Sequence, residues 1–353
     1  MATALSAAPY VEQKEYIAAK PRHRILFRVI ALAACAAQTF ASRNVINPDG
    51  RSYLEIARAI LANDWSMVIT GHWGTFYPLL SSVVLGIFRP CLRFEFPLIH
   101  LLNFVLFAGC LFSFEFFWKQ VLAHGNERLE PVGEACAVPE NLSWILGYTL
   151  FLSVVVPVLP YVTPDILLSA EIFLAAGVSL QTGKTESFGG HLLLGFLLGL
   201  GYLTKAILFP MGLVFLGLPT LVSLRKRKYN VAWASLVFLA LCTPQIVWLS
   251  HSKGHFTFSD SGKLTYDWYA YDLPNLNWQG EPAGSGVPRH PTRQIYSHPD
   301  VFEFNGPIRA SYPPWHDPSY WNEGMSPRFQ LRRFTQHGVE QLWLAFRSIC
   351  HPR

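Results

Sequence analysis

Residues 142–182 read LSWILGYTLFLSVVVPVLPYVTPDILLSAEIFLAAGVSLQT, and this stretch decides the class of fold. Two apolar runs, 142–161 and 166–182, lie on either side of a short polar link. Each run has about the 20-residue length that a helix needs to cross a hydrocarbon core of about 30 Å. The stretch therefore predicts two membrane-spanning helices that are joined at one membrane face.

Apolar runs of this kind recur along most of the chain. Its 353 residues are 51% hydrophobic and 14% charged, whereas a soluble domain carries about 25% charge. Run length predicts seven spans, at residues 25–42, 97–118, 142–161, 166–182, 190–204, 206–224 and 231–250. We therefore expect an all-α polytopic membrane protein with residues 25–250 as its transmembrane core.

Basic residues indicate the orientation, because cytoplasmic loops carry an excess of Lys and Arg. Such residues precede the first span, so the segment 1–24 is expected in the cytoplasm. The run RKRK at 225–228 then also falls inside. This orientation puts the loop 43–96 outside, together with the polar C-terminal region 251–353, which is rich in Trp, Tyr, Pro and His.

Two apolar segments do not fit a simple span. Residues 75–88 number only 14, and if they crossed, every later helix would invert and the basic run 225–228 would face outward. We therefore interpret 75–94 as a helix at the outer membrane interface. The fragment VEQLWLAFRSIC at 339–350 is a candidate for the start of an eighth span.

Charge and cysteine usage exclude other classes. A net charge of +5, with the cations mostly between apolar runs, does not indicate a nucleic-acid partner. The six cysteines form no CxxC or Cys/His spacing, so the sequence supports neither a zinc ribbon nor a disulfide scaffold.

The first motif that carries chemistry follows the first span directly. Residues 47–58 read NPDGRSYLEIAR, and Leu54, Ala57 and Leu61 recur at helical spacing, so Asp49 lies at the start of a predicted helix. Asp is a good N-cap residue, which is one interpretation. The other is an acid at the outer membrane edge that accepts a proton from an acceptor hydroxyl or binds a divalent metal.

The second motif, YVTPD at 161–165, lies between the third and fourth spans. Proline followed by an acid suits a helix start, so helix capping is again one interpretation. In the predicted orientation Asp165 lies at the same membrane face as Asp49, where two carboxylates can share a cation or a proton. If residues 75–88 crossed the membrane, the bilayer would separate the two acids.

The third motif, GFLLGLGYLTK at 195–205, ends the fifth span with a lysine at the outer face. Lys205 could extend its ammonium group to water from the membrane edge. It could equally bind the phosphate of a lipid-linked sugar, because Lys is a common point-charge partner of phosphate. The glycines of this span allow close helix packing.

In this order, the three motifs resemble the membrane glycosyltransferases of the GT-C superfamily, in particular the lipid A aminoarabinose transferase and protein O-mannosyltransferase family. NPDGRSYLEIARAIL (47–61) is similar to that family's acid-bearing first outer loop. VTPDILLSAEIFLAAG (162–177) is similar to its second acidic site, and LLLGFLLGLGYLTKAILFP (192–210) to its glycine-rich span ending in lysine. The resemblance covers about residues 25–250.

The resemblance implies seven spans with the active site at their outer face, in a bacterial inner membrane. A polyprenyl phosphate would carry the donor sugar, and transfer to a lipid, glycan or protein acceptor would invert the anomeric centre. By position, Asp49 would be the general base or orient the acceptor, Asp165 would be the second acid, and Lys205 would contact phosphate. Arg51 and Tyr53 accompany Asp49 as substrate-binding candidates.

The chain departs from the family pattern in two places. Where the aminoarabinose transferases have an acidic-basic pair before a proline, this chain has Phe76-Tyr77-Pro78, so Tyr77 is the substrate-binding candidate there. Gly50 replaces the second acid that often follows the first. His72, in the same outer loop, is either structural or a substrate contact. The one cofactor that the acids suggest is a divalent metal held by Asp49 and Asp165.

Two other functions compete with glycosyl transfer. A transporter or flippase of lipid-linked sugars would use the acids as proton relays, with acids spread through the spans and inverted repeats. A truncated, non-catalytic relative would have neither activity. In the C-terminal region, YDWYAYD (266–272) and YPPWHDPSYW (312–321) combine aromatic rings with carboxylates. This pattern suits acceptor binding and is also ordinary for membrane-interface residues.

Overall fold

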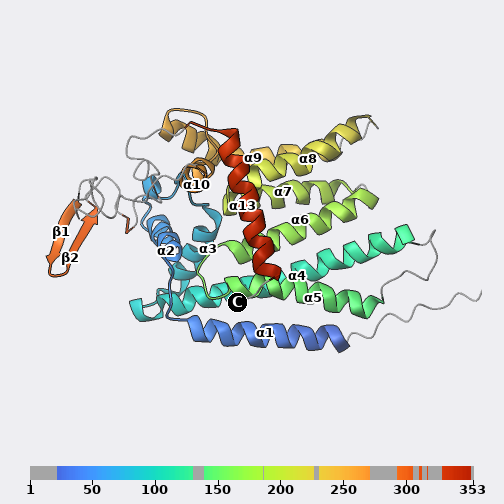
Figure 1. The fold of residues 1–353 in the computed structure, drawn as a ribbon, viewed down its shortest axis with the longest axis horizontal. Helices are drawn as coiled ribbons and strands as arrows, with labels where there is room; N and C mark the ends of the chain where they lie inside the picture. The colour runs from blue at the N-terminus through green and yellow to red at the C-terminus, as the bar shows by residue number, and fades with distance from the viewer. Residues whose placement is uncertain are drawn as a thin grey trace, which may run out of the picture.

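The computed structural model describes residues 22–129, 139–185, 187–225, 230–270, 292–304, 310–311, 316 and 328–350. Some of the predictions lie outside these residues, namely those for residues 1–21, for residues 226–229 and for most of the aromatic segment 312–321. Helices dominate the fold (Figure 1). They are α1 Arg22–Ser42, α2 Pro48–Leu61, α3 Phe76–Phe88, α4 Leu92–Leu129, α5 Glu140–Val155, α6 Asp165–Thr185, α7 Phe188–Thr204, α8 Leu208–Arg225, α9 Asn230–Lys253, α10 Ser261–Tyr269 and α13 Leu331–Cys350, with short 3-10 turns at Trp65–Met67 and Val156–Val158.

Five helical segments are long and apolar enough to cross a membrane, as expected of a helical membrane protein. They are Arg24–Ser42, Leu92–Gly125, Glu140–Val158, Asp165–Gly183 and Val231–Lys253, and each overlaps a predicted span. The other two predicted spans form α7 and α8, whose apolar parts are shorter. The 17 residues of α7 rise about 26 Å, less than a typical hydrocarbon core. The count of seven spans stays a prediction.

The long helices lie side by side in one bundle (Figure 1). Helix α6 packs between α4 and α7, and α7 packs between α6 and α9. Close approach of α7 to α9 depends on Gly195, because a Cβ there would lie 2.1 Å from the carbonyl oxygen of Ala234. The glycine spacing of the third motif therefore serves helix packing, as predicted.

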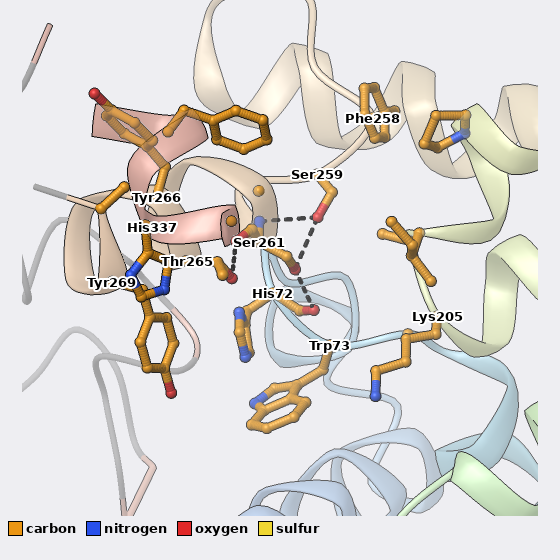
Figure 2. A pocket seen from close by; sticks show the side chains of 18 of the residues that line it. His72, Trp73, Lys205, Phe258, Ser259, Ser261, Thr265, Tyr266, Tyr269 and His337 are labelled. Carbon is orange, nitrogen blue, oxygen red and sulfur yellow. Dashed lines mark hydrogen bonds between the residues drawn. The ribbon is translucent and has the colours of Figure 1, made fainter. Parts of the chain in front are cut away.

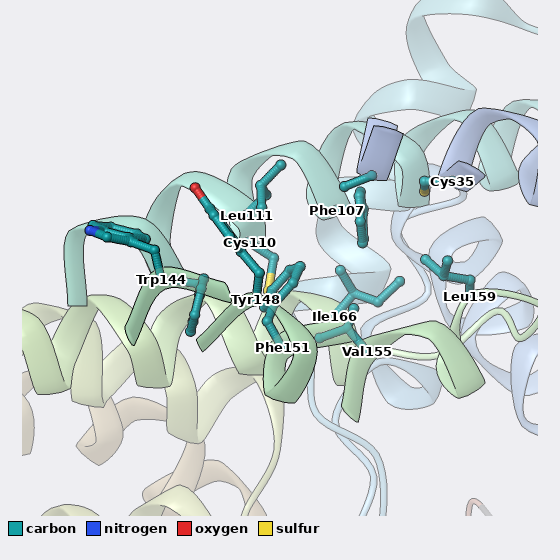
Figure 3. Close-up of a cluster of buried hydrophobic side chains, with 12 residues drawn as sticks. Cys35, Phe107, Cys110, Leu111, Trp144, Tyr148, Phe151, Val155, Leu159 and Ile166 are labelled. Atoms are coloured by element: carbon teal, nitrogen blue, oxygen red, sulfur yellow. The ribbon is translucent and has the colours of Figure 1, made fainter. Parts of the chain in front are cut away.

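Aromatic side chains fill the interior between α4, α5 and α6 (Figure 3). The rings of Phe114 and Phe151 stack with their centroids 4.8 Å apart, and Phe173 meets Phe114 edge to face at 5.4 Å. Such pairs add about 0.5–1.5 kcal/mol beyond the burial of their area. This cluster holds α6, whose first residue is Asp165, against α4.

The loop 43–96 starts and ends at one end of the bundle, which we call the α2 end. The ring Nε2 of His100, early in α4, lies 2.8 Å from the carbonyl oxygen of Val45, just after α1. Arg58 of α2 also binds Glu95 in the first turn of α4. Helix α3 between them therefore does not carry the chain across the bundle.

The predicted interfacial helix 75–94 is wrong in its extent. Helix α3 ends at Phe88, and Arg89 takes a left-handed conformation with φ 43° that caps it. Pro90 follows at once and has no N–H with which to continue the helix. A new helix, α4, begins at Leu92, so residues 92–94 belong to the long span.

The C-terminal region is not entirely helical. Strands β1 (Thr292–Ser297) and β2 (Asp300–Phe304) pair as an antiparallel hairpin, with Thr292 opposite Phe304. Figure 1 shows this hairpin projecting from the α2 end, away from the bundle. Helix α13 includes the fragment 339–350, but it is not among the helices apolar enough to cross a membrane.

Candidate functional site

The start of α2 is fastened to the turn that precedes α6. The side-chain oxygen of Asn47 accepts a hydrogen bond of 2.9 Å from the backbone N–H of Val162. Gly50 lies against the same residue, because a Cβ there would be 2.7 Å from the Cβ of Val162. The first two motifs therefore meet, and their acids Asp49 and Asp165 lie at the same end of the bundle.

Lys205 joins the two acids from α7. Its Nζ donates a hydrogen bond of 2.8 Å to Oδ1 of Asp165, so the ends of α6 and α7 are linked by an ion pair. The chain leaves α7 in an extended conformation at Lys205, which ends the helix. Asp165 in turn lies in the first turn of α6, where the helix dipole favours a carboxylate.

The loop before α3 packs on the last turn of α7. A Cβ at Gly74 would lie 2.1 Å from the carbonyl oxygen of Thr204 and 2.5 Å from that of Leu203. Only glycine allows the loop to approach Lys205 this closely. Thr204 also donates a hydrogen bond of 2.9 Å to Glu171 inside α6, which ties the lysine-bearing end of α7 to α6 a second time.

A cavity of about 690 Å³ opens beside this junction (Figure 2). Its walls come from the α2–α3 loop, the start of α8, α10 and α13, together with Tyr53 of α2. Most of the lining is apolar or aromatic, and Lys205 contributes an ammonium group. Figure 2 shows Lys205 and Trp73 on one side of the cavity and Tyr266, Tyr269 and His337 on the other.

Hydrogen bonds hold the α2–α3 loop to the segment that begins α10. The hydroxyl of Ser261 donates to the carbonyl oxygen of His72 at 2.9 Å. The hydroxyl of Ser259 donates to the carbonyl oxygen of Gly71 at 3.0 Å. The N–H of Asp260 also donates to the Gly71 carbonyl, at 2.6 Å. These bonds fix one wall of the cavity (Figure 2).

Burial and nearby charges change the protonation of the site. Burial raises the pKa of Asp49; the positive charge of Lys205 opposes this, and the negative charge of Asp165 adds to it. Burial, together with the positive charge of Lys205, lowers the pKa of His72 to about 4. Burial also raises the pKa of Tyr53, with added contributions from Asp165 and Asp49. At neutral pH, the imidazole of His72 and the phenol of Tyr53 are therefore uncharged.

This arrangement suits an amphiphilic anion. An ammonium group can bind a phosphate as a point charge, and the apolar walls can bury an isoprenoid chain or the faces of sugar rings. A neutral imidazole both donates and accepts hydrogen bonds, which matches a hydroxyl group.

The residues fit a resident divalent metal poorly. Lys205 already occupies an oxygen of Asp165. Among the residues that the structure describes, no cluster of three or more His, Cys, Asp or Glu side chains could hold a metal ion. We therefore derive no chemical step through a metal held by Asp49 and Asp165.

The predicted site residues divide into three groups. Lys205, Tyr53 and His72 line the cavity, whereas Asp49 and Asp165 interact with the lysine but are not among the lining residues. Arg51 pairs with Glu55 one turn along α2 at 3.2 Å, and it does not line the cavity either.

Tyr77 belongs to the protein interior. Its side chain is fully buried, and its hydroxyl donates to Oδ1 of Asn103 at 2.8 Å. The ring of Tyr53 meets it edge to face at 5.3 Å. Tyr77 therefore does not line the cavity, and the substrate-binding role predicted for it stays a prediction.

Several contacts at the α2 end have no signal in the sequence. Glu55 of α2 accepts hydrogen bonds from the backbone and the hydroxyl of Ser311, far along the chain. His316 is buried nearby and interacts electrostatically with Glu55 and His72. His337 and Gln341 of α13 complete the cavity. These contacts join segments about 250 residues apart, so only the tertiary fold brings them together.

Comparison of the chain with protein-family models, with curated proteins and with solved structures gives no match.

Proposed function

We propose that the chain is a membrane glycosyltransferase that moves a sugar from a polyprenyl-phosphate donor to an acceptor hydroxyl at the outer membrane face. One observation carries the proposal. A mainly apolar cavity at the end of a helical bundle contains the ammonium of Lys205. This ammonium forms an ion pair with Asp165, and it is close enough to Asp49 for its charge to lower the pKa of that acid.

In the proposed reaction, Lys205 binds the phosphate of the donor at the membrane edge. The oxygen of the acceptor attacks the anomeric carbon, the bond from that carbon to the phosphate oxygen breaks, and the phosphate leaves with the electron pair. Asp49 does not line the cavity, but it is partly exposed and lies within the electrostatic range of Lys205. In the proposed reaction the acceptor therefore binds on the Asp49 side of Lys205, and Asp49 takes the proton of its hydroxyl as general base. Its raised pKa makes it a stronger base than an exposed aspartate. Attack opposite the leaving phosphate inverts the anomeric centre.

Asp165 has a positioning role in this scheme. Its ion pair holds Nζ of Lys205, with a separation of 2.8 Å, at the edge of the cavity. Holding the phosphate and the acceptor in a fixed relation lowers the barrier through orientation. The aromatic rings of Tyr53 and Trp73, whose centroids are 4.7 Å apart, form a wall on which a sugar ring can stack.

The test is transfer of a labelled sugar from polyprenyl phosphate by the full chain in lipid vesicles with bacterial membrane acceptors. Asp49→Asn should abolish transfer while the protein keeps its helical content. Asp64→Asn is the matched control, because Asp64 lies in the same loop and contacts the exposed Ser66 hydroxyl. Unchanged transfer by Asp49→Asn would remove that residue from catalysis. Movement of the intact labelled lipid between leaflets would indicate a flippase instead.

A further inference from the structure

Helix α13 differs from every span in direction and in composition. Figure 1 shows it running crosswise in front of the bundle, whereas the spans lie along the bundle axis. It contains three arginines and one glutamate, and most of its described side chains are exposed. Its attachment to the rest of the chain includes a stacking contact between His337 and Tyr269 of α10, with ring centroids 5.9 Å apart.

One face of α13 is directed at the bundle. Phe334, His337 and Gln341 all line the cavity, together with Pro210 of α8 and with Ile207, just before α8. These three positions of α13 fall within an arc of about 60° on a helix that turns about 100° per residue. The helix therefore reaches the bundle where α8 begins.

A second face of α13 is apolar and exposed. Leu331, Val339 and Leu342 are exposed by 65%, 67% and 74%, and they fall within an arc of about 80°. Trp343, about 40° beyond Val339 around the helix, is 62% exposed, and the exposed Arg332 lies between the two. Large apolar side chains gathered on one exposed face mark an interaction surface.

A third face of α13 carries charge. Arg333, Glu340 and Arg347 are exposed and fall within an arc of about 40°, whose centre lies about 150° from that of the apolar face. The bundle-directed face lies between these two faces on one side of the helix.

This order of faces is the one that a helix needs if it lies on a membrane beside a bundle. The apolar and charged faces point in nearly opposite directions, toward lipid and toward water, and the side between them contacts protein. A crosswise axis is parallel to the membrane plane, because the spans define the membrane normal. The exposed Trp343 also suits a helix at the membrane surface, since Trp is enriched at membrane interfaces.

We propose that α13 is a membrane-surface helix that inserts Leu331, Val339 and Leu342 into the leaflet at the α2 end. Its contact with anionic phospholipid headgroups is made by Arg332, which is exposed and borders the apolar face. Three arginines against one glutamate leave the helix basic, and basic residues close to an anionic membrane surface are attracted to it. Lipid would thereby hold one wall of the cavity. The inference does not depend on glycosyl transfer.

The test is the depth of a fluorophore on two faces of the helix. Leu342→Cys and Glu340→Cys are made in a parent whose native cysteines are alanine, and each is labelled with an environment-sensitive dye. The full chain is placed in vesicles of phosphatidylethanolamine and phosphatidylglycerol that contain nitroxide-labelled acyl chains. The dye at position 342 should be quenched several-fold more strongly than the dye at position 340, whose native side chain is 72% exposed.

Each outcome decides the proposal. Equal quenching at the two positions would overturn it. A dye at position 342 that is shielded from water but not quenched by lipid would overturn it in favour of a protein partner or a second copy. Two results would support the anionic-lipid contact. Quenching at position 342 would weaken when Arg332→Gln and Arg333→Gln are combined, and it would also weaken when phosphatidylcholine replaces phosphatidylglycerol.

Discussion

The ion pair between Arg58 and Glu95 joins the end of α2 to the start of α4, and its removal tests how the α2 end is assembled. Nε of Arg58 lies 3.0 Å from Oε1 of Glu95, and Nη2 lies 2.5 Å from Oε2, so the contact is bidentate. The Glu95 side chain is 8% exposed, whereas that of Arg58 is 42% exposed. Arg58→Met leaves the buried carboxylate without its cation.

The expected cost of Arg58→Met is about 2–3 kcal/mol of unfolding free energy. Removing one partner of a fully buried pair costs about 3–5 kcal/mol, and we take a smaller value because the exposed part of the guanidinium is screened by solvent. Arg51→Met on the same helix is the matched control. Its single 3.2 Å contact with Glu55 is local and more exposed, so we expect a cost of about 0–1 kcal/mol.

The assay is denaturant unfolding of the purified chain in mild detergent, followed by tryptophan fluorescence. Combining Arg58→Met with Glu95→Gln should recover a large part of the loss, because the buried charge is then absent. The reasoning would be refuted if Arg58→Met cost no more than Arg51→Met. It would equally be refuted if the effects of Arg58→Met and Glu95→Gln were simply additive.

Two further predictions concern the lysine-bearing junction. Gly74→Ala should destabilise the protein by about 1–3 kcal/mol, because its Cβ would meet two backbone carbonyl oxygens of α7. Gly125→Ala is the control, because a Cβ there meets nothing within 4 Å. In the same unfolding assay, Gly125→Ala should be neutral or stabilising. The proposed transfer should fail at low pH as the Asp49 carboxylate is protonated. The charge of Lys205 lowers the pKa of Asp49. Lys205→Met should therefore raise that pKa and move the acid limb of the pH–rate profile of the residual activity to higher pH. An acid limb at the same pH as in the wild type would contradict the role of Asp49 as base.

Run length and charge in the sequence predict most of the bundle. The apolar runs at 25–42, 97–118, 142–161, 166–182 and 231–250 each become a helix long enough to cross a membrane. This follows because lipid offers no hydrogen-bond partner to an exposed backbone, so an apolar run of this length can cross only as a helix. Boundaries were less predictable, as at Arg89, whose left-handed conformation separates α3 from α4.

The convergence of three motifs at one end of the bundle was also predictable, through the argument that 75–88 does not cross. Alternating direction then puts Asp49, Asp165 and Lys205 at the same end, and the structure joins Asp165 and Lys205 at 2.8 Å. Which neighbours surround them could not be read from the sequence. Tyr53 and Tyr77 are both aromatic residues of the same outer loop, yet one lines the cavity and the other donates to Asn103 in the interior.

Most of the long helices, and the end of the bundle at which the charged motifs lie, could therefore be predicted from the sequence alone. These features are local, since they depend on runs of about 20 residues and on the cost of placing polar groups in lipid. The cavity could not be predicted in this way, because its walls combine residues of α2, α8, α10 and α13. Contacts between such distant segments depend on how side chains pack, which no local pattern of residues encodes.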